Sequence, residues 1–293
     1  MNRRQFVATG ASSLILASPL FQQSTTQNSS MHLGKTGIQL YTLRDLIAKD
    51  IHKTLNRLST IGFAGVETAF WPDDVSIEDA GKILKEKGLT VLSSHCEIPV
   101  GDGKEKMLRM AEAYHCKRMV WHGWPEDKRY KTSDGIKELT SIYNEASAFA
   151  KSNGLQFGLH NHWWEFHNRI GDRFAYEVLQ DDLDKDVFFE IDTYWVKTAG
   201  HDPAKIVKQL GKRAPLLHIK DGPARYNDDL ANDKSPMVPV GKGTQDFPSI
   251  VKAAAGNTEW MIVEMDLLAM DHFEAIQQSY DFLTKNKLAV GEQ

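Results

Sequence analysis

The sequence predicts a single α/β domain folded as a (β/α)₈ TIM barrel. Short apolar segments of strand length alternate about eight times with longer segments whose apolar residues recur at helical spacing. The chain has 293 residues, enough for one barrel of about 250 residues and an additional N-terminal segment. Ionisable residues stand at the C-terminal ends of several apolar segments, which is the edge where such barrels carry their sites.

The alternation is regular enough to assign most elements. Leu55 and Leu58, for example, follow Ile51 at helical spacing until Gly62 ends the segment. The predicted strands are 37–41, 65–67, 89–94, 119–121, 155–160, 187–192, 216–221 and 261–266, and the predicted helices are 51–61, 77–87, 104–115, 135–151, 173–183, 203–210, 247–255 and 273–285. A doubly wound sheet is the alternative, but it would usually carry a glycine-rich phosphate-binding turn, and the sequence has none.

The first 30 residues are predicted to be an export signal and polar linker, and the barrel domain to span 31–293. Arg3 and Arg4 precede an apolar stretch from 7 to 20, and a Ser/Thr/Gln-rich tract from 22 to 30 follows. This order resembles a twin-arginine export signal, so we expect a periplasmic or otherwise exported protein. The apolar stretch is shorter than the roughly 20 residues that a membrane helix needs, so we expect no membrane span in the mature protein.

The composition favours a protein with a large core that does not bind nucleic acid. Hydrophobic residues make up 41% of the chain and aromatic residues 10%. The formal net charge is -4 and the pI about 6.3, whereas nucleic-acid-binding proteins carry an excess of basic residues. The two cysteines, Cys96 and Cys116, each flank a strand-like segment, so buried free thiols are expected. The sequence is compatible with a homo-oligomer but does not identify one.

Four strand ends carry candidate ligands for one divalent cation. Asp192, His218 and Glu264 lie one on each of three successive predicted strands. Carboxylates and imidazoles together suit a hard or borderline ion such as Mn²⁺, Mg²⁺, Co²⁺ or Zn²⁺. The fourth ligand is expected between 155 and 167. His160 ends the strand with its side chain on the face that a ligand needs. Glu165 offers the better charge match from just beyond the strand, so both are candidates.

His162 and Lys220 are the predicted acid–base residues. Each follows a candidate ligand by two residues, so it faces the same way but lies nearer the barrel mouth. A histidine suits proton removal from carbon. A lysine close to a cation and to His218 would have a lowered pKa, or it would stabilise an enolate. The alternative for Lys220 is a salt bridge with Asp221 or Asp192.

Several residues around the same mouth are candidates for substrate binding. His95 and His122 end the third and fourth strands and could either bind sugar hydroxyls or form capping hydrogen bonds. Trp163 and Trp195 offer aromatic faces on which sugar rings stack, although they could also be ordinary packing. The irregular stretch 222–248 follows the His218 strand, so it is expected to cover the site and to bring Arg225 to the substrate.

These motifs resemble the xylose-isomerase-like TIM barrel superfamily, whose members include sugar phosphate isomerases and epimerases. The similarity rests on five segments, which are 158–166 (Gly-Leu-His-Asn-His, then Glu-Phe), 192–195, 218–221, 241–247 and 263–264. It implies a barrel enzyme with a divalent cation held by a strand-five residue together with Asp192, His218 and Glu264. Ketose epimerases of this group carry glutamate where His160 stands and histidine where Trp195 stands. The His162 and Lys220 pair is more similar to the dehydratase and lyase members.

The favoured expectation is therefore a divalent-metal-dependent sugar isomerase or epimerase. Such an enzyme removes a proton from the carbon next to a metal-bound carbonyl and forms an enediolate. The alternative is a related dehydratase or lyase, including elimination or hydrolysis of 3-keto-glycosides, which the resemblance also implies. An endonuclease-like barrel and a non-catalytic sugar-binding barrel are less favoured. The expected partner is a small sugar, keto-sugar or glycoside.

Overall fold

The protein is described here by a computed structural model that covers residues 32–227 and 235–292. The predicted export signal and linker at 1–30 lie outside the described residues, so the export signal and its boundary stay predictions. Among the described helices, none combines the length and the apolar character needed to cross a bilayer.

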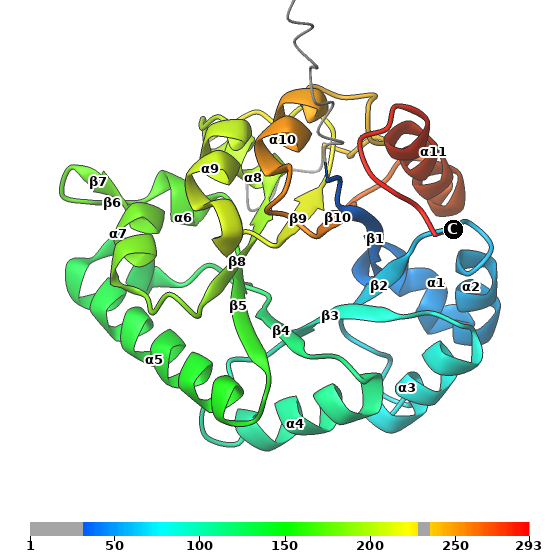
Figure 1. The fold of residues 1–293 in the computed structure, drawn as a ribbon, viewed down its shortest axis with the longest axis horizontal. Coiled ribbons are helices and arrows are strands. Elements are labelled where there is room, and N and C mark those ends of the chain that lie inside the picture. Colours follow the sequence, from blue (N-terminus) through cyan, green and yellow to red (C-terminus); the bar gives the residue numbers. More distant parts are fainter. Residues whose placement is uncertain (1–31, 228–234, 293) are drawn as a thin grey trace, which may run out of the picture. The chain divides into compact units, whose positions relative to one another are not determined.

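The described residues form a closed barrel of eight parallel strands (Figure 1). The strands are β1 Lys35–Gln39, β2 Gly65–Thr68, β3 Val91–Cys96, β4 Arg118–Trp121, β5 Gln156–His160, β8 Phe188–Asp192, β9 Leu216–Ile219 and β10 Trp260–Val263. They pair in chain order, and β1 closes the cylinder by pairing with β10. The predicted TIM barrel is confirmed, and the doubly wound alternative is wrong because the sheet has no open edge.

Helices form a ring outside the strands (Figure 1). They are α1 Arg44–Lys49, α2 Ile51–Leu58, α3 Ile77–Glu86, α4 Gly103–Tyr114, α5 Ser133–Ser152, α6 Trp164–His167, α7 Ala175–Asp182, α8 Thr193–Thr198, α9 Pro203–Leu210, α10 Phe247–Ala254 and α11 His272–Lys285. Polar caps start many of them, as Ser76 does when its hydroxyl accepts the N–H of Asp79 at the start of α3. The main hydrophobic core lies between these helices and the strands.

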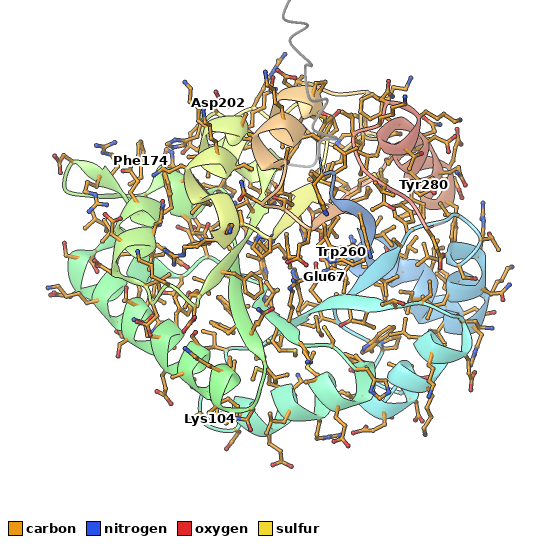
Figure 2. The ribbon with its side chains drawn as sticks, viewed as in Figure 1. Glu67, Lys104, Phe174, Asp202, Trp260 and Tyr280 are labelled. Carbon is orange, nitrogen blue, oxygen red and sulfur yellow. The ribbon has the colours of Figure 1, made fainter. Side chains whose placement is uncertain are left out.

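The barrel interior is apolar at one end and polar at the other. Leu92, Val120, Phe188, Leu216 and Ile262 fill the first end, with Trp260 packed against them. Gly158 makes room there, because a Cβ at this position would lie 2.3 Å from the Phe188 ring. Figure 2 shows Glu67 and Trp260 inside the ring of helices. The polar end is the one at which the strands finish, so residues that close successive strands meet there.

Several short elements were absent from the sequence prediction, among them three helices and one hairpin. These are α1, α6, α8 and a two-stranded hairpin formed by β6 Arg169–Ile170 and β7 Arg173–Phe174. Each is too short to show a periodic apolar pattern. The start of α8 nevertheless has a clear cause, since Asp192 Oδ1 accepts the N–H groups of Tyr194 and Trp195. Both cysteines are buried and free, as predicted.

Asp221 fixes both ends of the irregular stretch after β9. Its carboxylate accepts the backbone N–H groups of Gly222, Gly241, Gly243 and Gln245 at 2.9 to 3.2 Å. A Cβ on Gly243 would lie 2.2 Å from Asp221 Oδ1, so glycine is required for this close approach. Asp221 therefore fixes the described ends of this stretch and is occupied by backbone donors, which leaves Lys220 to other partners.

Candidate active site

Four of the predicted ligands meet at the C-terminal end of the barrel. His160 ends β5, Asp192 ends β8, His218 lies in β9, and Glu264 directly follows β10. One ligand atom from each of these residues lies within 4.8 Å of the others, and all four side chains are buried. Two imidazoles and two carboxylates form a donor set suited to Mn²⁺, Co²⁺ or Zn²⁺. We call this set the ligand group.

The directions of the donor atoms also fit a cation. Asp192 uses Oδ1 to cap α8, and its buried Oδ2 makes no hydrogen bond of good geometry, although Lys220 Nζ lies 3.0 Å away. His218 Nδ1 and Glu264 Oε2 approach to 2.7 Å, but the pair lacks hydrogen-bond geometry. Close polar atoms that do not point at each other are typical of donors that share a third partner. The ligand group therefore fits a divalent cation.

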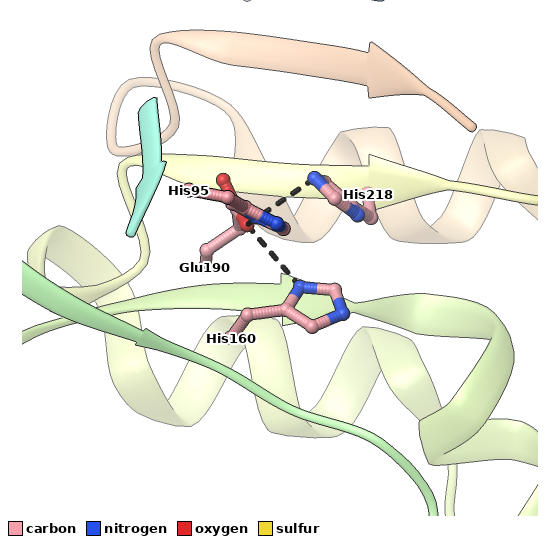
Figure 3. A group of neighbouring side chains, drawn as sticks. All are labelled: His95, His160, Glu190 and His218. Carbon is pink, nitrogen blue, oxygen red and sulfur yellow. Dashed lines mark hydrogen bonds and ion pairs between the residues drawn. The ribbon is translucent and has the colours of Figure 1, made fainter. Parts of the chain in front are cut away.

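A second set of possible donors lies beside the first and shares two residues with it. It comprises His95, His160, Glu190 and His218, which Figure 3 shows gathered around the Glu190 carboxylate. His95 Nε2 hydrogen-bonds Glu190 Oε2 at 2.7 Å, and His218 Nε2 hydrogen-bonds Glu67 Oε1 at 2.7 Å. Because both nitrogens are already engaged with buried carboxyl groups, neither is free to bind a cation. The second set is better explained as hydrogen-bonded support for the first.

Glu67 is the centre of that support. The fully buried carboxylate accepts hydrogen bonds from Gln39 Nε2 at 2.6 Å, from the Ser93 hydroxyl and from His218. Burial alone would raise the pKa of Glu67, but His95 and His218 reverse this and lower it to about 2. The charged Glu67 thus keeps the proton of His218 on Nε2 and leaves Nδ1 facing the ligand group.

Glu165 lies apart from both sets of donors. It belongs to α6 and contributes to a small cavity behind β5, among Tyr130, Phe166 and Phe189. Its Oε2 accepts the backbone N–H of His162 at 3.0 Å, and burial raises the pKa of Glu165 to about 8. Of the two candidates for the fourth ligand, the structure places His160 in the ligand group and Glu165 in a supporting position beneath His162.

Asn161 connects two of the strand ends that carry the site. Its side-chain carbonyl accepts the N–H of Asp192 at 2.9 Å, and its amide donates to the backbone carbonyl of His162 at 3.1 Å. The residue between His160 and His162 therefore sets the positions of its two neighbours and of Asp192. Sequence reasoning missed this role, although the residue's place between two candidate histidines was a usable signal.

Lys220 is surrounded by carboxylates. Its Nζ lies 3.0 Å from Asp192 Oδ2, 2.8 Å from Glu264 Oε2 and 2.8 Å from Asp266 Oδ2. Burial alone would lower the pKa of Lys220, but these three charges outweigh burial and raise it well above its usual value. The lowering of this pKa expected beside a bound cation concerns the loaded site and stays a prediction. The salt bridge with Asp192 is present.

His162 faces a cavity of about 340 Å³ above the ligand group. Its ring stacks on Trp164 at a centroid distance of 4.4 Å, and burial lowers its pKa well below the usual value. His160 and Lys220 line the same cavity. The neutral imidazole and the charged ammonium therefore face one space, as an acid–base pair must.

The remaining candidates divide between two cavities. His95 and His122 line the 340 Å³ cavity, where His122 also accepts the N–H of Trp124. Trp195 lines this cavity and a neighbouring one, and Arg225 lines only the neighbouring one. Trp163 lines neither of them and packs edge-on against Trp164.

Glu165→Gln should preserve divalent-cation affinity and reduce the pH dependence of stability. The raised pKa of Glu165 means that its contribution to the free energy of unfolding is complete below its ordinary value of 4.5 and is lost as the pH rises through about 8. The wild type should lose on the order of 2–4 kcal/mol from this group between pH 5 and pH 8, and the variant should not. Urea unfolding and Zn²⁺ titration measure both effects. Loss of Zn²⁺ affinity in Glu165→Gln would contradict its supporting position.

Glu67→Gln should weaken divalent-cation binding about 10- to 100-fold, because the amide cannot supply the charge that orients His218. Ser93→Ala is the matched control, since it removes a different hydrogen bond to the same carboxylate. Competition with a chelating dye measures both affinities. Equal affinities in Glu67→Gln and the wild type would show that Glu67 does not orient His218.

Comparisons with known proteins agree with this architecture. The model of the family "Xylose isomerase-like TIM barrel" matches residues 55–286. A sugar phosphate isomerase/epimerase from Parabacteroides distasonis ATCC 8503 superposes with a TM-score of 0.69 at 25% identity, covering 87% of this chain and 100% of the other. A second from the same organism gives 0.68 at 23%, covering 89% and 97%.

A more distant structure has the same fold. A probable 3-DHS dehydratase from Bacillus anthracis has a TM-score of 0.63 at 14% identity, covering 85% of this chain and 98% of the other. No curated protein matches the sequence. Because the family model spans most of the barrel, this chain belongs to the xylose isomerase-like TIM barrel family.

Proposed function

We propose that the protein is a divalent-metal-dependent enzyme of the sugar isomerase/epimerase type. The observation that carries this proposal is the convergence of His160, Asp192, His218 and Glu264, two of which line one cavity together with His162 and Lys220. The relatives named as sugar phosphate isomerases/epimerases support a sugar as substrate. A divalent cation held by the ligand group would supply Lewis-acid polarisation of a substrate carbonyl.

His162 is the proposed proton acceptor. It lines the cavity, and its position is held by the stacked Trp164 ring, by Asn161 and by the backbone bond to Glu165. A side chain fixed in this way needs little reorganisation when it takes the proton from the carbon next to the carbonyl.

Lys220 is proposed to act as a cation and proton donor. Three carboxylates keep its ammonium charged and confine Nζ next to Glu264. A fixed positive charge at this place would stabilise the negative charge that develops on the substrate oxygen after the proton is removed. Lys220 would then act through its charge, and His162 would act as the base.

One acceptor and one donor also suit a second reaction. Epimerisation and isomerisation return the proton to carbon, whereas β-elimination needs a base for carbon and an acid for the leaving group. Because Lys220 is an ammonium rather than a second base, elimination from a keto-sugar or glycoside is the second candidate. Arg3 and Arg4, before the apolar stretch, support the further proposal that the enzyme works after export.

Two substitutions should separate cation binding from proton transfer. Glu264→Gln removes a charged donor from the ligand group, so it should abolish both divalent-cation binding and turnover. His162→Ala should keep the cation but lose deuterium exchange at the substrate carbon next to the carbonyl. Proton NMR measures this exchange in deuterium oxide. The reactions contain a panel of sugars and keto-glycosides together with Mn²⁺ or Co²⁺. Exchange at the wild-type rate in His162→Ala would assign the base elsewhere.

A further inference from the structure

We propose that the substrate carries a second ring, bound in a separate cavity next to the reaction cavity. The inference rests on the proposed function for the first ring, since it places the reacting sugar next to the ligand group. The second cavity has a volume of about 380 Å³ and is lined by Tyr194, Trp195, Arg225, Tyr226, Met237 and Leu267, among others. A cavity of this size accommodates a ring-sized group.

The two cavities adjoin at two side chains. Trp195 and Asp266 line both of them. Asp266 Oδ2 lies 2.8 Å from Lys220 Nζ, which lies 2.8 Å from Glu264 Oε2. The second cavity is thus only two side chains away from the ligand group. A substituent on a sugar bound beside Lys220 could reach it directly.

Exposed hydrophobic residues gather at the same two cavities. Phe70 and Trp124 line the reaction cavity and are 59% and 52% exposed. Tyr226 and Leu267 line the second cavity and are 41% and 39% exposed. Among the described residues, four of the five exposed large hydrophobic side chains therefore stand at the mouth. Apolar residues concentrated in this way mark a binding surface rather than chance exposure.

The second cavity suits a ring better than an isolated anion. Arg225 makes no hydrogen bond or ion pair among the residues that the structure describes, so its guanidinium can bind a hydroxyl or acidic substituent. The lining also includes the polar side chains of Thr198, Asn227 and Ser235, but the Asp266 carboxylate stands in the same wall and would repel a phosphate. Aromatic walls bind the apolar faces of sugar or aryl rings. The favoured ligand class is therefore a glycoside rather than a free or phosphorylated monosaccharide.

Isothermal titration of the Zn²⁺-loaded protein tests this assignment. The probes are glucose, galactose, mannose and xylose, their phenyl β-glycosides and glucose 6-phosphate. For the sugar that is recognised, we expect the phenyl glycoside to bind at least tenfold more tightly than the free sugar. Leu267→Trp should fill the second cavity and abolish this preference while preserving the affinity for the free sugar.

Val290→Trp is the matched control, because it makes the same kind of change at an exposed apolar residue that lines neither cavity. It should keep the glycoside preference. Equal affinity for free sugar and glycoside, preference for the sugar phosphate, or no glycoside binding at all would overturn the proposal. The glycoside preference could persist while His162→Ala exchanges deuterium at the normal rate. In that case the assignment of the second cavity would stand, and only the proposed chemistry would be rejected.

Discussion

The site depends on balancing several buried acids at one end of the barrel. Glu67, Asp192 and Glu264 are almost completely inaccessible to solvent, and an unpaired carboxylate in such a place is strongly unfavourable. Lys220 compensates two of them directly and His218 contacts the third. A divalent cation would add positive charge at the same place. The requirement for compensation thus explains why acidic, imidazole and ammonium groups occur together on neighbouring strands.

The side chains of the site lie in layers along the strands. One residue separates His160 from His162 and His218 from Lys220, so each strand would contribute a cation donor and then an acid–base group nearer the mouth. Glu67 lies beneath His218 and supports it. The period of the β-strand therefore determines which side chain orients, which binds and which reacts.

Much of this arrangement could be predicted from sequence, and the rest has identifiable reasons. Alternating strand and helix patterns were sufficient for the barrel, and strand-end positions were sufficient for Asp192, His218 and Glu264. Strand-end positions could not decide between His160 and Glu165, because the choice depends on α6, which turns Glu165 behind β5. Asp192 was foreseen as a salt-bridge partner of Lys220, whereas Glu264 and Asp266 join it only in three dimensions.

The supporting residues were hardest to foresee for a related reason. Glu67 is 151 residues away from His218, so no local pattern connects them. The side chain of Asn161 bonds backbone groups, so only its place between two candidate histidines could point to its role.

The proposed site requires that one cation is coordinated by His160, Asp192, His218 and Glu264. Electron spin-echo envelope modulation of the Mn²⁺-loaded protein can count the imidazole nitrogens bound to the ion. Two imidazole nitrogens are expected, from His160 and His218. A single bound imidazole nitrogen would indicate that Glu165 or water replaces His160. Three bound nitrogens would place the ion in the second set of donors, with His95. Either result would contradict the proposed coordination.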